Sequence, residues 1–262
     1  MQRRSFLRAL IATVGVTELV HLPPAHAAGI DELALGNEVF AQLREDGEMF
    51  FDSTYYEHLN EVGSIIAETA RPRYPYPIRY YIVRGDSANA FAVPGGNIYV
   101  NEALLKLTKN RDELAGVLAH ETGHMVLHHV AKRIANQNKA NVLGSAIQIV
   151  GAIFGGWVGA DAAGYLSSVG AASQDAHLSQ HIEAQADEEG ARIIAASKQF
   201  NPYGLIWFFE IMSATYGPGQ KGWLMDHPLD QARIDDLRNL ITNDPALFGM
   251  WKDTQQKDQV YW

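Results

Sequence analysis

The 262-residue sequence contains no cysteine. Disulfide bonds, a thiol nucleophile, thiolate metal ligands and a cysteine-linked lipid anchor are therefore excluded. Positive charge is also scarce, because 21 Lys and Arg stand against 30 Asp and Glu, for a net charge of -9. Surfaces that bind nucleic acid are rich in Lys and Arg, so we expect no nucleic-acid partner. Hydrophobic residues make up 47% of the chain, which is typical of a globular protein.

The N-terminal segment is typical of an export signal. Three arginines, two of them adjacent as in a twin-arginine signal, precede a modestly apolar stretch over residues 9–22. Ala25 and Ala27 supply the small residues that a signal peptidase reads. We therefore predict cleavage after Ala27, a mature domain over residues 28–262 and a periplasmic location. The alternative is an amphipathic N-terminal helix or an uncleaved anchor.

The rest of the chain is predicted to be one mainly helical α+β domain with a small, mostly antiparallel sheet. Apolar residues follow helical spacing over residues 30–70. Residues 78–84 are β-branched and aromatic and predict a strand. Two more short strands, at 89–93 and 97–100, flank a Pro-Gly-Gly turn and should form a hairpin.

Residues 142–160 form a glycine-rich stretch without any charge. Its length approaches that of a membrane span. However, its five glycines weaken a helix, so a buried helix or helical hairpin is the favoured interpretation. Peripheral membrane contact through this stretch is the alternative.

The candidate chemistry lies on a helix predicted from Asn110 to about Asn136. It contains His120-Glu121-Thr122-Gly123-His124, an H-E-x-x-H motif. Residues four apart share a helix face, so His120 and His124 can bind one metal ion. Glu121 lies beside the open position of that ion, where it can accept a proton from bound water.

A third ligand is predicted downstream. Glu183 and Asp187 are one helical turn apart and point the same way. Two His and one Glu complete a catalytic zinc site, and Asp187 can then accept the ring N–H of a ligand His. The plain alternative is a solvated acidic helix face. His128 and His129 are interpreted as packing or surface residues, because the spacing of an extended metzincin motif is absent.

Together these segments resemble the zinc endopeptidase family that contains HtpX-type proteases and type I CAAX prenyl proteases. The resemblance implies a gluzincin-type, zincin-like peptidase domain with one Zn²⁺. Gln185 stands where this family often has Glu, and we expect it to point away from the metal. Because the sequence shows neither multiple membrane spans nor a helical-repeat tail after residue 262, we expect the soluble, exported, minimal-domain branch. The matching segments are 89–96, 113–121, Gly123-His124, 183–187 with Gly190, Asn201-Pro202, His227-Pro228 and Arg233-Ile234.

The resemblance also predicts a substrate-binding strand. It places Asn89, Ala90, Phe91 and Ala92 on an edge that pairs with an extended peptide, which favours unfolded or misassembled envelope proteins as substrates. An interior strand is the alternative. A non-proteolytic chaperone or assembly factor using the same groove, and a structural zinc protein, are the alternative functions.

His227 and Arg233 complete the family pattern, and their roles stay open at this point. Pro228 restricts His227 to extended backbone, so its ring is carried on a loop. His227 could donate to the oxyanion, occupy the fourth position on zinc as an inhibitory latch, or merely cap a loop. Arg233 could support either polar role by pairing with a carboxylate such as Asp187.

Overall fold

The computed structural model describes residues 30–138, 176–217 and 223–255. The predicted export signal at residues 1–27 and the charge-free stretch at 142–160 lie outside the described residues. None of the described helices is long and apolar enough to cross a membrane.

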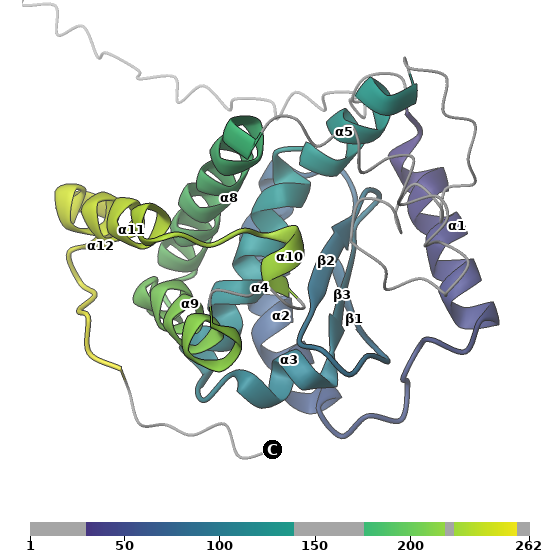
Figure 1. Cartoon of the computed structure of the whole chain (residues 1–262), viewed down its shortest axis with the longest axis horizontal. Helices are drawn as coiled ribbons and strands as arrows, with labels where there is room; N and C mark the ends of the chain where they lie inside the picture. The colour runs from purple at the N-terminus through teal and green to yellow at the C-terminus, as the bar shows by residue number, and fades with distance from the viewer. Residues whose placement is uncertain (1–29, 139–175, 218–222, 256–262) are drawn as a thin grey trace, which may run out of the picture.

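Helices dominate the fold and pack around one small sheet, as predicted for a mainly helical α+β domain (Figure 1). The strands are β1 (Arg79–Val83), β2 (Ala90–Val93) and β3 (Asn97–Asn101). The helices are α1 (Glu32–Glu45), α2 (Tyr56–Ala70), α3 (Glu102–Leu107), α4 (Arg111–Val126), α5 (His129–Asn138), α8 (Ala176–Ser197), α9 (Tyr203–Tyr216), α10 (Trp223–Asp226), α11 (Gln231–Asn243) and α12 (Pro245–Phe248), with a 3₁₀ turn, η2, at Arg71–Arg73.

The sheet has the strand order β1-β3-β2. β2 and β3 form the predicted antiparallel hairpin, whose turn contains Gly95 and Gly96 at φ +96° and +107°. These are left-handed conformations that side chains rarely adopt. β1 pairs with β3 in parallel, so the sheet is mixed rather than mostly antiparallel. The prediction missed this because the hairpin inserts β3 between β1 and β2, although β1 and β2 are consecutive in sequence.

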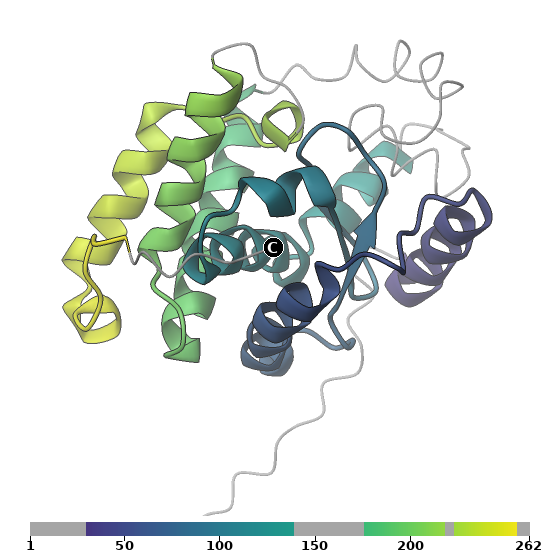
Figure 2. The same ribbon diagram turned by 90° about the horizontal axis from the view of Figure 1, so that it is seen from below.

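α4 lies at the centre of the molecule, between the sheet on one side and α8 and α9 on the other (Figures 1 and 2). Its first turn is capped by Asn110, whose side chain accepts a hydrogen bond from the Glu113 N–H at 2.9 Å. Glycine allows close packing further along, because a Cβ at Gly123 would lie 2.7 Å from the carbonyl oxygen of Ala186 on α8. α4, which carries the H-E-x-x-H motif, therefore packs closely against α8, which carries Glu183.

The single helix predicted to run to about Asn136 is two helices. α4 ends at Val126, and α5 begins after His128, which has a left-handed φ of 55°. The His128 ring shares a 2.7 Å hydrogen bond with the carboxylate of Glu32, which is only 1% exposed. Glu32 lies 96 residues earlier in the chain, so local periodicity could not reveal the break.

Candidate metal centre

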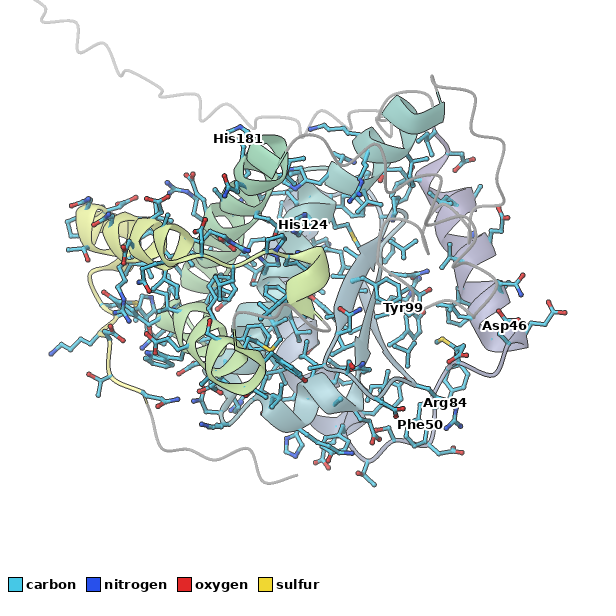
Figure 3. The ribbon with its side chains drawn as sticks, viewed as in Figure 1. Asp46, Phe50, Arg84, Tyr99, His124 and His181 are labelled. Atoms are coloured by element: carbon cyan, nitrogen blue, oxygen red, sulfur yellow. The ribbon has the colours of Figure 1, made fainter. Side chains whose placement is uncertain are left out.

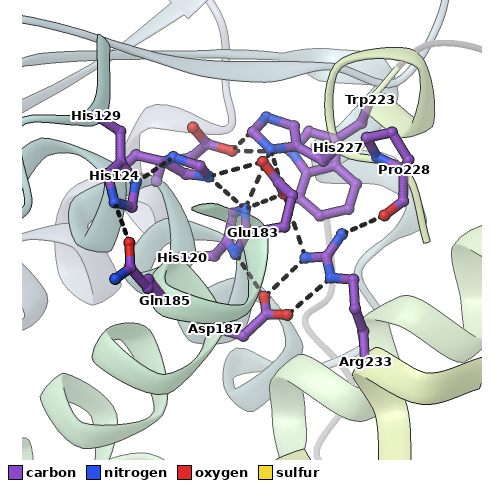
Figure 4. Close-up of polar contacts among 11 residues, drawn as sticks. His120, His124, His129, Glu183, Gln185, Asp187, Trp223, His227, Pro228 and Arg233 are labelled. Atoms are coloured by element: carbon purple, nitrogen blue, oxygen red, sulfur yellow. Dashed lines mark hydrogen bonds and ion pairs between the residues drawn. The ribbon is translucent and has the colours of Figure 1, made fainter. Parts of the chain in front are cut away.

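Four side chains converge beside α4 (Figure 4). His120 and His124 come from α4, Glu183 from α8 and His227 from the segment that follows α10. Their potential ligand atoms all lie within 4.8 Å of one another, and all four residues are buried. The three predicted ligands are thus brought together, and the structure adds His227 to the same group.

The donor atoms are spaced as a bound cation would hold them. Nε2 of His120 lies 3.1 Å from Nε2 of His124 and 3.2 Å from Nδ1 of His227. Nδ1 of His227 also lies 2.9 Å from Oε2 of Glu183. A tetrahedral ion with bonds of about 2.0–2.1 Å keeps its ligand atoms about 3.3 Å apart. The residues present therefore fit a metal ion with nitrogen and oxygen ligands.

The electrostatics of the cluster favour a positive charge. Burial raises the pKa of the Glu183 carboxyl, but the nearby His227 and His124 rings outweigh burial and hold that pKa well below its ordinary value. Burial also opposes protonation of His120, yet the carboxylates of Asp187 and Glu183 raise its pKa to about 9. A negative potential of this kind also stabilises a bound cation.

Asp187 and Arg233 fix the orientation of His120 from the Nδ1 side of its ring, away from the cluster. Nδ1 of His120 lies 2.8 Å from Oδ1 of Asp187, so in the neutral ring, the form that binds a metal, donation from Nδ1 leaves the lone pair of Nε2 facing the cluster. Arg233 donates two 2.8 Å hydrogen bonds to the two oxygens of Asp187 and a third, at 2.7 Å, to the Pro228 carbonyl. Arg233 therefore connects the loop of His227 to the partner of His120.

Glu121 is completely buried beside the cluster. Its Oε1 accepts a 2.9 Å hydrogen bond from the indole N–H of Trp223, whereas its Oε2 has no partner among the described residues. Burial raises the pKa of this carboxyl. The Trp223 ring stacks on His227, with centroids 4.5 Å apart. Sequence reasoning missed Trp223. Its position four residues before His227 could have indicated that the two rings lie on the same side of a helical turn.

A second set of contacts lies on the Nδ1 side of the His124 ring, away from the cluster. Nδ1 of His124 is 3.0 Å from Nδ1 of His129, and Nε2 of His129 is 3.3 Å from Oε1 of Gln185. Burial lowers the pKa of His129 to about 3, so the ring is neutral. His128 and His129 thus lie outside the ligand group. Gln185, expected to point away from the metal, contacts His129, the neighbour of the candidate ligand His124.

β2 forms one edge of the sheet and lies next to α4. Within the described ranges, no further strand pairs with its outer side. Two hydrophobic clusters form the core, a larger one around α4 and a smaller one beside α1. The side chains of Ala90 and Ala92 pack into the larger cluster, whereas Phe91 belongs to the smaller one. Just before β2, the carbonyl of Ala88 accepts a 2.7 Å hydrogen bond from the backbone N–H of Trp223. The start of α10 is therefore attached to this edge.

Comparison with known proteins gives one consistent result. The chain matches peptidase family M48 over residues 57–241, which include every residue of the cluster. It is 30% identical over 219 residues to a beta-barrel assembly-enhancing protease of Yersinia pestis, covering 79% of this chain. It spans only 43% of that relative's length.

Two further relatives are covered over more of their length. The metalloprotease LoiP of Escherichia coli K12 is 26% identical over 193 residues, 74% of this chain and 73% of that protein. The mitochondrial metalloendopeptidase OMA1 of Schizosaccharomyces pombe is 25% identical, over 97% of this chain and 79% of that protein. Since the family match spans most of the described domain and all of its cluster, the chain belongs to peptidase family M48, the HExxH-type metalloproteases.

Proposed function

We propose that this chain is a zinc-dependent endopeptidase of the bacterial cell envelope that cleaves unfolded or misassembled proteins. The observation that carries the proposal is the buried Oε2 of Glu121, which has no hydrogen-bond partner among the residues that the structure describes and lies beside three converging imidazoles and the Glu183 carboxylate. An unpaired buried carboxylate oxygen is costly, so it is expected where a reacting group binds.

His120, His124 and Glu183 would hold the zinc ion, since mixed imidazole and carboxylate ligands are those of catalytic zinc sites. When bound, zinc polarises a substrate carbonyl and lowers the pKa of a bound water to about 7. Asp187 keeps the His120 ring in the tautomer and orientation that ligation needs.

Glu121 is proposed as the general base and acid. Its Oε2 takes a proton from the attacking water and later delivers the proton to the leaving amine. Trp223 holds the other oxygen, Oε1, and thereby fixes the orientation of the carboxylate. Burial supports the role because it raises the pKa of Glu121 towards the range in which proton transfer in both directions is efficient.

His227 is proposed as a removable fourth ligand. Four protein ligands close a zinc site, whereas catalysis needs an open position. His227 follows a helix of only four residues, unlike the long helices that carry the other three ligands. We therefore favour the latch over the oxyanion donor, with Arg233 as the residue that positions the loop.

The substrate assignment rests on the edge strand and on the relatives. An extended peptide could pair with the outer side of β2 over Asn89, Ala90, Phe91 and Ala92 through main-chain hydrogen bonds, which favour unfolded chains over a given sequence. The name of the Yersinia relative and the predicted export signal support the bacterial envelope as the location and its proteins as substrates. Peripheral membrane contact through residues 142–160 stays part of this proposal.

The deciding experiment measures cleavage of an unfolded protein such as casein by the zinc-loaded chain, with and without a chelator. We expect cleavage that the chelator abolishes and added zinc restores. Glu121→Gln should keep about one zinc per chain and lose activity about 10²–10⁴-fold. His120→Ala should lose the metal, and the exposed His181→Ala is the control.

Three other results contradict the proposal. Binding of unfolded protein without turnover indicates the chaperone alternative. Full zinc content in His120→Ala removes the ligand assignment. Cleavage at the normal rate by Glu121→Gln removes the general base.

The structural metal site is the second candidate, because four donor atoms already converge. It predicts that the chelator unfolds the protein and that no peptide is cleaved under any metal condition.

A further inference from the structure

The contact between His129 and His124 depends on the break between α4 and α5. Residues five apart in a continuous helix lie about 140° apart around its axis, so their rings point in different directions. Here the left-handed turn at His128 brings the His129 ring back against His124, edge to face, with centroids 5.0 Å apart. The break thus creates a contact that a straight helix could not make.

The left-handed turn at His128 is stabilised by residues outside α4 and α5. A non-glycine residue with positive φ is uncommon and is retained when its surroundings stabilise it. The His128 ring bonds the buried Glu32 carboxylate, which also accepts a 2.7 Å hydrogen bond from the Tyr74 hydroxyl. The Tyr74 oxygen in turn accepts the Gly95 N–H at 2.9 Å. The hairpin turn, α1 and the break are joined in one hydrogen-bond network, in which the His128 ring is partly exposed.

The number of N–H groups on a neutral imidazole determines where the protons lie in the contact between His124 and His129. A neutral imidazole carries one N–H, so His124 can ligate through Nε2 only when its proton is on Nδ1. That proton needs an acceptor, and the atom 3.0 Å away is Nδ1 of His129. His129 must then carry its own proton on Nε2, which faces the Oε1 of Gln185 at 3.3 Å. The amide oxygen of Gln185 is the acceptor that this arrangement requires.

We propose that His129 is a positioning residue that orients the His124 ring, and that Gln185 selects the tautomer of His129. The inference rests on the proposed function, because it takes His124 as a metal ligand. The two ligand histidines of α4 then have different partners. His120 bonds an anion, Asp187, whereas His124 bonds a neutral relay of an imidazole and an amide. His129 is 7% exposed, so water competes little for the contact.

The test measures the dissociation constant of the full-length chain for zinc by competition with a chromophoric chelator. His129→Phe keeps a ring but has no acceptor, and we expect about 10–100-fold weaker binding. His181→Phe is the matched control, since His181 is exposed at the outer end of α8 while His124 lies inside (Figure 3). An affinity of His129→Phe equal to that of the wild type overturns the inference.

A second pair of variants decides the question even if His129→Phe does not fold. Gln185 is exposed, so we expect its replacement to leave the fold intact. Gln185→Glu offers only acceptor oxygens and should bind zinc at least as tightly as the wild type, whereas Gln185→Leu should bind more weakly. Equal affinities of the two variants overturn the inference.

Nitrogen NMR of the zinc-loaded chain adds a readout that folding defects do not imitate. It should show His124 protonated at Nδ1 and His129 at Nε2. A His129 protonated at Nδ1 contradicts the relay. A wild-type chain that binds no zinc overturns both this inference and the proposed function, whereas a zinc-dependent peptidase unaffected by His129→Phe overturns the inference alone.

Discussion

The indole N–H of Trp223 donates a 2.9 Å hydrogen bond to Oε1 of Glu121, and both side chains are completely buried. The proposed general base is therefore tied to the short helix that leads to His227. A change in the position of α10 necessarily changes the surroundings of Glu121. Movement of α10 therefore affects both Glu121, the proposed base, and His227, the proposed removable ligand.

Removing the indole donor should destabilise the fold. Trp223→Phe keeps an aromatic ring but leaves the buried Glu121 carboxyl without its only hydrogen-bond donor among the described residues. We expect the free energy of unfolding to fall by about 1.5–3 kcal/mol, measured by urea denaturation of the metal-free chain. Trp207→Phe is the control, because Trp207 donates to the partly exposed Asp253 and its loss should cost less. Equal losses in the two variants contradict the prediction.

Removing the proposed fourth ligand distinguishes the possible roles of His227. His227→Ala leaves His120, His124 and Glu183 in place, so the chain should retain zinc while gaining an open position. We expect faster cleavage of casein, with the zinc content measured by elemental analysis. Slower cleavage with zinc retained indicates an oxyanion donor instead. Loss of zinc indicates a structural site, and no change removes His227 from the mechanism.

A methyl group between two helices should disturb the metal centre from a distance. The Cβ of Gly123→Ala would lie 2.7 Å from the Ala186 carbonyl oxygen and force α4 away from α8. Overpacking of this kind costs about 1–3 kcal/mol, and zinc affinity should fall because Glu183 moves relative to His124. Gly190→Ala is the graded control, since its contacts begin at 3.0 Å. A larger effect of Gly190→Ala contradicts the prediction.

Alkaline pH should unfold the protein through buried tyrosines. Burial is the main cause that raises the pKa of Tyr74 and Tyr80 above the ordinary value of 10.0. The folded state binds these protons more tightly than the unfolded state, so their contribution to stability is complete below about pH 10 and is lost as the pH rises further. Absorbance at 295 nm should show the buried phenols ionising together with loss of circular dichroism. Ionisation of all 11 tyrosines in the folded chain contradicts this.

Local spacing predicted the parts of the site that lie on single helices. His120 and His124 share a face because they are four residues apart, and Glu183 and Asp187 do so for the same reason. Turn chemistry predicted the β2–β3 hairpin. In contrast, the approach of His227 to His120 spans 107 residues, and only the family resemblance suggested it.

Contacts between distant segments account for what sequence reasoning missed. The break at His128 depends on Glu32, and the parallel pairing of β1 depends on where the hairpin inserts. The hydrogen bond from Trp223 to Glu121 joins residues 102 apart and requires α10 to lie beside α4. Periodicity contains no information on such long-range contacts.

The hydrogen bond from the backbone N–H of Trp223 to the Ala88 carbonyl bears on the proposed binding of peptides along the edge of β2. Hydrogen bonding alternates along an antiparallel strand, so this carbonyl points to the same outer side as the main-chain groups of Ala90 and Ala92. The chain itself is therefore the first occupant of the edge. A peptide that extends along the whole edge has to displace it, so its apparent affinity is the intrinsic affinity multiplied by the fraction of molecules in which α10 is detached. If β2 binds substrates as proposed, a short peptide that pairs only with Ala90 and Ala92 avoids this competition, whereas a longer segment that reaches Ala88 does not.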